Sequence, residues 1–267
     1  MIETTPYGEV LQIKLCKDKG FTAVSCYLLD GLLIDTGPAH TAQEFTEFLR
    51  SAPVKTVINT HHHEDHIGAN KFLRERYGVE IFAPPLAVDK INKPADLFPY
   101  QEHVWGYPIP SQVKSLGTSI STGLYTLEVI PTPGHDRDHI CLFERQHRWL
   151  FTGDTYTTTQ PVVCRPMENQ RQIIEDLKVL RSLDPRILFP APTRVIVEPL
   201  DKLDETIAYL EGLGGRIEDL HRKGMTPEEI REQIFGEENP AAERTQQQFS
   251  SVNMIMSFLK VPGPGKK

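Results

Sequence analysis

The chemically richest stretch of the chain is residues 61–66, which contain four histidines, a glutamate and an aspartate. The preceding residues 54–59 form a β-branched run that predicts a buried strand, so His61 and His63 leave the following turn on one side. The last two residues of the stretch are expected to open the next helix. Imidazole and carboxylate groups suit zinc, iron or manganese, and crowding them together without a cation costs repulsion and desolvation. The stretch therefore indicates a metal site rather than a solvated polar turn or a chance cluster of histidines.

Three carboxylate or imidazole side chains elsewhere in the chain also follow apolar runs. His135 comes after the residues Ile-Pro-Thr-Pro-Gly, and Asp154 comes after Leu-Phe-Thr-Gly. Asp35 follows Leu-Leu-Ile, so it too is expected at the end of a strand. A carboxylate at that place could accept an N–H from an imidazole that binds a metal. The sequence thus predicts further ligand types in strand-end loops.

The order of these motifs resembles that of the metallo-β-lactamase superfamily. His-x-His-x-Asp-His occupies residues 61–66, Thr-Pro-Gly-His occupies residues 132–135, and Gly-Asp occupies residues 153–154. The resemblance covers most of residues 1–200 and implies an α/β (α+β) fold, an αββα sandwich of two mixed β-sheets flanked by helices. In that fold the metal centre lies along one edge. The substrate does not follow from the resemblance, because function belongs to the site and not to the fold.

Carried over residue by residue, the resemblance implies a ligand set for two metals. It makes His61, His63 and His135 the ligands of the first metal, which leaves one coordination position open. Two ligands of the second metal would be Asp65 and His66. A further carboxylate, Asp154, would bridge the two metals.

The chain departs from the family pattern at the last ligand of the second metal. Residues 186–190 match a late strand, but Ala-Pro-Thr follows at 191–193 where the family has a Pro-Gly-His-Gly turn. Water, the hydroxyl of Thr193 or the carboxylate of Glu198 could take the place of the missing histidine. Three outcomes are open: one tightly held metal, a second metal held loosely with substrate completing its shell, or a fold that has lost catalysis. Because even loss of a group that only supports a ligand costs about 10–100-fold in affinity or activity, we expect one strong and one weak zinc site, with iron or manganese as alternatives.

The chemistry of such a centre is the activation of water. A divalent metal lowers the pKa of bound water from about 15.7 to about 7 and polarises a carbonyl or phosphoryl oxygen. The resemblance implies that Asp65 orients the resulting hydroxide and accepts its proton, with Asp154 facing it. His66 would hold the second cation or donate to the leaving group. The expected catalytic residues are therefore Asp65 and His66.

Other histidines and cysteines have less specific surroundings in the sequence. His62 points away from its neighbours if the turn is extended, so we expect it to be solvated or packed rather than a ligand. His139 is either a wall of the site or a core histidine. Cys164 follows the Asp154 loop and either lies near the metals or is a buried thiol. The other three cysteines fall in apolar strand runs, which indicates buried reduced thiols.

Composition limits the partners and the location. The chain has 267 residues, a net charge of −7 and no concentrated Lys/Arg patch, so nucleic-acid binding is not expected. No apolar run approaches the roughly 18 residues that span a membrane, and the first residues lack the features of a signal peptide. We therefore expect a cytoplasmic protein that acts on a small molecule and binds no membrane.

The pattern along the chain divides it into two regions and a tail. Residues 1–200 form the predicted αββα domain, within which residues 84–112 are too rich in proline and aromatics for a regular element. That segment is either a substrate-site lid or a structural cap over the sheet edge. Residues 201–260 form a helical C-terminal extension that packs beside the site or forms a homodimer contact, and residues 261–267 are expected to be flexible.

Helices are predicted from capping signals and apolar stripes at several places. Thr226, followed by Pro227 and two glutamates, is typical of a helix start. The predicted helices span residues 42–49, 68–77, 200–221 and 227–235, and an apolar stripe follows at residues 240–259.

Three classes of function remain open from the sequence. The leading hypothesis is a metal-dependent hydrolase in which hydroxide attacks a small ester, thioester or lactone, since the surface is acidic and the segment 84–112 is apolar. The second hypothesis is a mononuclear iron dioxygenase that oxidises a thiol or persulfide, as in one branch of the superfamily that the chain resembles. The third is a non-catalytic metal-binding remnant. RNA cleavage is disfavoured by the charge.

Overall fold

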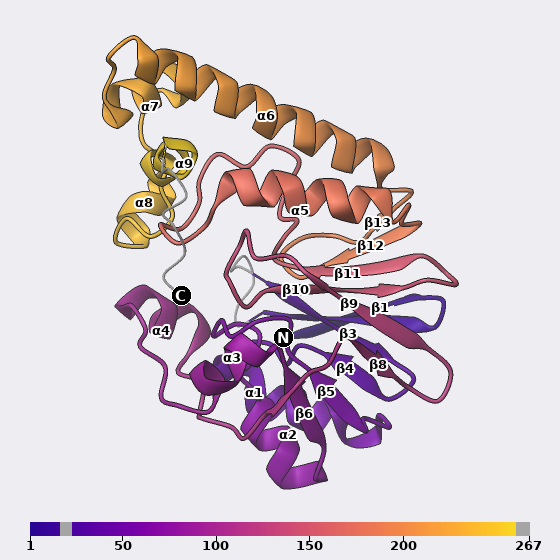
Figure 1. Cartoon of the computed structure of the whole chain (residues 1–267). Coiled ribbons are helices and arrows are strands. Elements are labelled where there is room, and N and C mark those ends of the chain that lie inside the picture. The colour runs from indigo at the N-terminus through magenta and orange to yellow at the C-terminus, as the bar shows by residue number, and fades with distance from the viewer. Residues whose placement is uncertain (17–22, 260–267) are drawn as a thin grey trace.

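The structure is a computed structural model that describes residues 1–16 and 23–259. Two β-sheets face each other, and helices cover the outer face of each sheet (Figure 1). The αββα sandwich expected from the sequence is therefore confirmed. The tail predicted to be flexible, residues 261–267, lies outside the described residues.

The first sheet has seven strands in chain order and is mixed. The pairs from β1 to β4 are antiparallel, and those from β4 to β7 are parallel. The edge strand β1 was not predicted, because its four central residues are exposed and show no alternation of apolar and polar side chains. The strands are β1 (Ile2–Tyr7), β2 (Val10–Leu15), β3 (Val24–Leu29), β4 (Leu32–Ile34), β5 (Thr56–Ile58), β6 (Glu80–Ala83) and β7 (Lys114–Ser115).

The second sheet has six strands in the order β13-β12-β11-β10-β9-β8. All its pairs are antiparallel except β11 with β12, which is parallel. The predicted ligands His135 and Asp154 lie in the loops after β9 and β11. The position where the family histidine is missing lies in the loop after β12. The strands are β8 (Ser119–Ser121), β9 (Thr126–Pro131), β10 (Ile140–Glu144), β11 (Trp149–Gly153), β12 (Ile187–Pro190) and β13 (Ile196–Val197).

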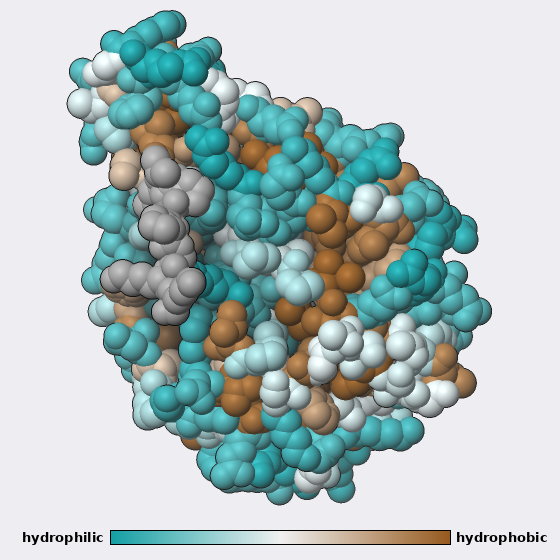
Figure 2. Space-filling model, viewed as in Figure 1, coloured by the Kyte–Doolittle hydropathy of each residue, from teal (hydrophilic) through white to brown (hydrophobic). Residues whose placement is uncertain are grey.

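Alternate residues of each strand point to different layers. In β3, Cys26 packs in the core beneath the helices, whereas Tyr27 packs between the two sheets. Between the sheets, the rings of Phe151 and Phe189 stack with centroids 4.8 Å apart, and Tyr27 lies edge-on to Phe189 at 5.3 Å. Hydrophilic residues cover the outer helices in Figure 2, and apolar residues gather in the middle of that view, where the sheets lie. The two sheets are thus joined by a continuous apolar layer.

The helices on the first sheet include two that the sequence did not predict. The predicted helices at 42–49 and 68–77 are observed, but residues 84–112 contain α3 and α4 in place of an irregular segment. Pro85 and Pro99 stand at the first position of these helices, where proline costs no hydrogen bond and its fixed φ favours the helix. These prolines start helices rather than break them. The helices are α1 (Ala42–Phe48), α2 (Asn70–Tyr77), α3 (Pro85–Ile91) and α4 (Pro99–Trp105).

The C-terminal extension packs with α5 on the outer face of the second sheet. Its first two helices match the predicted ranges, and Thr226 and Glu229 cap the second of them reciprocally. The apolar stripe at 240–259 is split into two helices instead of forming one. Within the described residues, no helix is both long and apolar enough to cross a membrane. The helices are α5 (Gln170–Ser182), α6 (Leu200–Arg222), α7 (Pro227–Phe235), α8 (Pro240–Arg244) and α9 (Ser251–Leu259).

Candidate metal centre

The turn that carries residues 61–66 follows β5 and is held by hydrogen bonds to the residues after the neighbouring strand β4. The carboxylate of Asp35, which follows β4, accepts the backbone N–H of Thr60 at 2.8 Å and its hydroxyl at 2.9 Å. The carbonyl of His66 accepts the N–H of Thr36 at 2.8 Å, so it is not available to a helix. The prediction that Asp65 and His66 open a helix is therefore wrong, and α2 begins only at Asn70.

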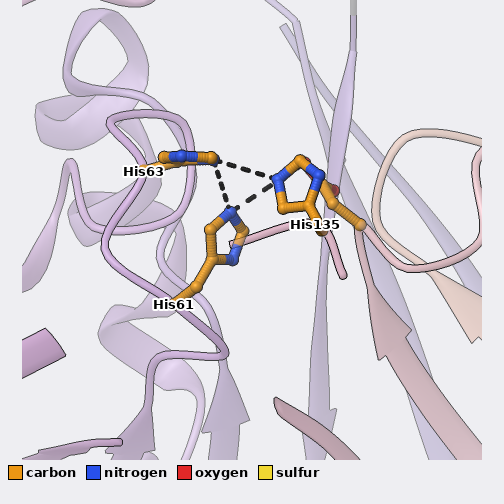
Figure 3. A group of neighbouring side chains, drawn as sticks. His61, His63 and His135 are labelled. Carbon is orange, nitrogen blue, oxygen red and sulfur yellow. Dashed lines mark hydrogen bonds and ion pairs between the residues drawn. The ribbon is translucent and has the colours of Figure 1, made fainter. Parts of the chain in front are cut away.

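Three histidines from two sheets meet at one end of the sandwich. Nε2 of His61 lies 2.9 Å from Nδ1 of His63, and Nε2 of His135 lies 3.1 Å from the same nitrogen. Figure 3 shows the three rings turned toward a common point. Nitrogen ligands held at about 2.0–2.1 Å around a tetrahedral ion lie roughly 3.3 Å apart, which is close to this spacing. The arrangement therefore matches three imidazole ligands of one metal.

These imidazoles are in the form that a metal requires. Burial, followed by the charges of nearby histidines, holds the pKa of His61 well below its ordinary value. Burial also lowers the pKa of His63, with Arg165 as the next cause, and it lowers that of His135 to about 3. All three rings are therefore neutral at pH 7 and keep a lone pair for a metal.

A second group of ligand atoms adjoins the first. Nε2 of His66 lies 3.4 Å from Oδ1 of Asp154 and 3.7 Å from Oδ2 of Asp65. Asp154 also belongs to the first group, since its Oδ2 lies 3.6 Å from Nε2 of His135 and 4.0 Å from Nε2 of His61. The carboxylate of Asp154 therefore lies where it could contact two ions.

Buried polar atoms in the second group lack partners. Asp65 Oδ1, His66 Nε2 and Asp154 Oδ1 have no hydrogen-bond partner among the described residues. Such atoms are costly unless something binds them, and these atoms are those that a cation would contact. Nδ1 of His66 meets Oδ2 of Asp35 at 2.8 Å, as expected of an imidazole whose other nitrogen faces a metal. The donor set therefore fits a divalent cation.

Charge in the second group is distributed between one imidazole and two carboxyls. Burial lowers the pKa of His66, but Asp154, Asp35 and Asp65 together raise it well above its usual range. Burial raises the pKa of Asp65 to about 7, whereas His66 overcomes burial and holds the pKa of Asp154 below its usual range. In the absence of a metal, a positive imidazole would thus stand in for part of the missing positive charge.

The structure removes one candidate for the missing ligand. Glu198 is 71% exposed, and its N–H bonds the carbonyl of Arg186, which precedes β12. It therefore lies at the opposite end of β12 from Ala191 and cannot replace the histidine. Pro192 lines the cavity beside the ligand groups, and the hydroxyl of Thr193 stays a prediction.

Two other histidines lie near the ligand groups and have other partners. His139 is buried and is not among the residues that line the cavity; its Nε2 accepts the backbone N–H of Asp154 at 3.0 Å, so it supports the Asp154 loop from the core. His62 turns away, as expected, and its Nδ1 lies 2.8 Å from Asp138. The ammonium of Lys90 lies within 3.3 Å of that histidine and of both Asp136 and Asp138, so this outer acidic pair already has a cation.

Among the described residues, no cysteine belongs to a group of candidate metal ligands. Cys164 is buried and its backbone pairs with Ser250, between the Asp154 loop and α9. Cys26 and Cys141 are buried as expected, whereas Cys16 is half-buried.

A cavity of about 1210 Å³ adjoins the two ligand groups. Asp65, His135 and Asp154 form part of its wall, and α4 and α8 form other parts. The segment 84–112 therefore contributes to the wall of the site, and the C-terminal extension packs beside it. Arg165 and Glu168 also line the cavity. Neither was predicted, because no pattern near them in the sequence indicates that they lie close to the histidines.

Comparison with known proteins decides the family. The model of the metallo-β-lactamase superfamily matches residues 20–191. The chain belongs to the metallo-β-lactamase superfamily. The family expected from the order of motifs in the sequence is therefore confirmed.

Curated relatives in the superfamily share part of the sequence. The chain is 29% identical over 122 residues to the hydroxyacylglutathione hydrolase of Bdellovibrio bacteriovorus, which covers 45% of this chain and 40% of that protein. It is 26% identical over 219 residues to the β-lactamase-like protein 2 homolog of Drosophila melanogaster, covering 76% and 70% of the two chains. The chain thus spans less than half the length of the first of these relatives.

A solved structure shows the same fold over nearly the whole chain. A β-lactamase domain protein from Burkholderia ambifaria superposes with a TM-score of 0.72 and 17% identity, and the match covers 96% of this chain and 87% of that one. The structural match therefore extends beyond the sandwich into the C-terminal extension.

Proposed function

We propose that the chain is a metal-dependent hydrolase that cleaves a small-molecule thioester, with esters and lactones as substrates of the same carbonyl chemistry. The observation that carries the proposal is the meeting of two buried groups of ligand atoms at the wall of one cavity. The sequence similarity to hydroxyacylglutathione hydrolase, an enzyme named for a thioester, supports the choice of thioester over ester.

The ligand roles follow the geometry described above. His61, His63 and His135 would hold a tight zinc ion, with Asp154 at its edge, and Asp65, His66 and Asp154 would hold a second ion weakly. Three protein ligands leave a position open, which is typical of catalytic rather than structural zinc. The absence of a histidine at position 192 is the reason to expect the second ion to bind less tightly.

A divalent ion there would polarise the substrate carbonyl and lower the pKa of a water bound to it. Asp65 forms part of the cavity wall and has an oxygen without a partner, so its carboxylate can orient a water and accept its proton. Asp35 fixes the ring of His66 through Nδ1, which aims Nε2 at Asp65 and Asp154.

The first test combines metal analysis with a hydrolysis assay. Purified protein is assayed for zinc, iron and manganese per chain, then for release of thiol from acyl thioesters of glutathione and of N-acetylcysteamine, with oxygen esters and lactones beside them. We expect one tightly held zinc ion, a second that is lost to mild chelation, and thiol release that returns when zinc is added back. One tightly held iron and consumption of oxygen with a thiol substrate would replace the hydrolase proposal with the oxidation chemistry.

A variant pair links the activity to the three histidines. His61→Ala removes one of the three proposed ligands of the tight ion. It should therefore abolish tight metal binding and thiol release together. His221→Ala changes an exposed histidine on α6 and serves as the matched control. Activity retained by His61→Ala would overturn the assignment of the first site.

A further inference from the structure

A buried arginine lies in the cavity wall beside the ligand groups. Only 7% of the Arg165 side chain is exposed, on the segment between β11 and α5, and it lines the cavity with Asp65, His135 and Asp154. A buried cation is costly unless it is both paired and hydrogen-bonded. The partners of Arg165 therefore show whether its position is explained by the protein alone.

The acidic neighbours of Arg165 support its charge without using its N–H groups. A terminal nitrogen lies 3.6 Å from Oε1 of Glu64, beyond hydrogen-bonding distance, and that oxygen already accepts from Gln101 at 2.8 Å. Glu168 accepts the backbone N–H of Arg165 at 3.1 Å rather than its guanidinium. The Nε of Arg165 is buried and has no hydrogen-bond partner in the part of the chain that the structure describes. Within the described residues, the Nε donor of the guanidinium is therefore available to a bound molecule.

An aromatic ring lies against this guanidinium. Its central carbon lies 4.9 Å from the ring centroid of Phe249, which precedes α9 in the C-terminal extension. A cation over an aromatic ring is attracted to it without using its N–H groups, which stay available to a planar, two-oxygen partner. Because Phe249 also lines the cavity, the ring and the guanidinium both belong to the surface that a bound molecule meets.

The guanidinium lies close to where the carbonyl of a substrate would react. Glu64 stands between the ligands His63 and Asp65 in the chain, and Glu168 has an oxygen 3.8 Å from Nδ1 of His135. Arg165 lines the same cavity as Asp65 and His135, and its charge is one cause of the lowered pKa of His63 and His135, so the guanidinium lies near the ligand groups. An anion bound by Arg165 would therefore share the cavity with a carbonyl at the metal centre.

We propose that Arg165 is a specificity residue that binds a carboxylate of the substrate, so that the favoured substrates are thioesters carrying a carboxylate close to the scissile carbonyl. This rests on the proposed function, which it narrows to anionic substrates. A carboxylate would accept two N–H groups from the guanidinium, and such two-point pairs are strong and directional. Apolar residues of the wall, among them Val162 and Val163, would contact the carbon chain between the two ends.

The competing explanation is that Arg165 only offsets the negative charge of Glu64 and its neighbours. In that case the arginine would affect metal binding and stability but would not distinguish charged from neutral substrates. Substrate discrimination therefore separates the two explanations, whereas loss of activity in a variant would not.

The first experiment uses the metal-loaded wild-type protein alone. Succinyl, glutaryl and adipyl thioesters of N-acetylcysteamine are compared with the butyryl, pentanoyl and hexanoyl thioesters of equal length. A second arm places the carboxylate on the thiol, with butyryl 3-mercaptopropionate compared with its methyl ester. We expect kcat/KM to be about 10-fold or more higher for the anionic member in one arm, which also tells on which side the carboxylate lies. Equal kcat/KM in both arms at every length would overturn the proposal.

The second experiment asks whether Arg165 causes the preference. Arg165→Met should bring the ratio of anionic to neutral kcat/KM to near 1, a fall of about 10-fold or more, and Arg165→Lys, which keeps the charge but not the fork, should lower it less. Arg50→Met removes an exposed arginine outside the cavity and should keep the wild-type ratio. A ratio unchanged in Arg165→Met would assign the preference to another residue and overturn the proposal. If Arg165→Met does not fold, Arg165→Lys decides the same question.

A binding measurement separates this proposal from the hydrolase proposal. Calorimetry compares glutarate with pentanoate on the metal-loaded protein, since both can bind the metal by one carboxylate and only glutarate has a second. Tighter binding of glutarate that is lost in Arg165→Met, with none of the thioesters cleaved, would support the anion site and overturn thioester hydrolysis. Cleavage of charged and neutral thioesters with equal kcat/KM would do the reverse.

Discussion

Replacing Asp35 with asparagine tests how the second ligand group is held. Asp35 is 2% exposed and accepts three hydrogen bonds, two from Thr60 and one from Nδ1 of His66 at 2.8 Å. Its φ of 60° is in the left-handed region, which asparagine tolerates about as well as aspartate. The substitution Asp35→Asn therefore keeps the shape of the side chain and its backbone, and changes only charge and bonding.

The size of the effect follows from the bonds that an amide cannot make. Whichever way the amide turns, its NH₂ faces at least one of the donors from Thr60 and His66, and one of the two oxygens accepts two of the bonds. A buried hydrogen bond to a charged group contributes about 1.5–3 kcal/mol, so losing one or two lowers the free energy of unfolding by about 2–5 kcal/mol. Because Asp35 also fixes the ring of His66, affinity for the second metal should fall about 10–100-fold.

Urea unfolding and metal competition measure the two effects of Asp35→Asn. Unfolding of the metal-free protein gives the change in stability, and titration with a chelator gives the affinities of the tight and weak ions separately. The exposed Asp96→Asn is the matched control and should leave both ion affinities unchanged. The reasoning fails if Asp35→Asn binds the weak ion as tightly as the wild type, or if it weakens the tight ion more than the weak one.

Three further predictions concern the same end of the molecule. Pro192→His should strengthen binding of the second metal, measured as ions retained after dialysis; unchanged retention would mean that position 192 does not face the Asp65 group. Gly68→Ala should lower the free energy of unfolding by more than about 3 kcal/mol, because its Cβ would lie 2.2 Å from the backbone nitrogen of Ala39; a loss within 1 kcal/mol would show that the turn can shift. Burial raises the pKa of Glu168 from 4.5 to about 7, so this carboxyl favours the folded state below pH 4.5 and loses that contribution as pH rises through 7. The stability of metal-free Glu168→Gln relative to wild type should therefore rise by up to about 3 kcal/mol between pH 4.5 and 8, and a difference independent of pH in thermal unfolding would contradict this.

The parts of the site that the sequence predicts are those with short-range signals. His61 and His63 stand in one motif directly after a β-branched run, and His135 and Asp154 each follow a strand, so their types and places could be read directly. The contact from Asp35 to His66 was also predictable, because both groups follow parallel neighbouring strands, whose ends lie together.

The parts that were missed depend on contacts between distant segments. Glu64 and Arg165 are about a hundred positions apart in the chain, and neither has a pattern around it that indicates the other. Glu198 was considered as a ligand because it follows the right strand, but β13 reverses direction and carries it to the far end of β12. In residues 84–112, prolines that commonly end regular structure instead begin two helices, and only the packing of those helices distinguishes the two cases.

The ligands of the candidate centre are divided between the two halves of the chain. His61, His63 and His66 follow a strand of the first sheet, whereas His135 and Asp154 follow strands of the second. An ion bound among them would therefore clamp one sheet to the other, much as a cross-link does, at the rim where their shared apolar layer ends. Neither half could assemble the full ligand set during synthesis, so metal capture would report that both halves have docked. The same ion that serves catalysis would then act as a checkpoint of assembly.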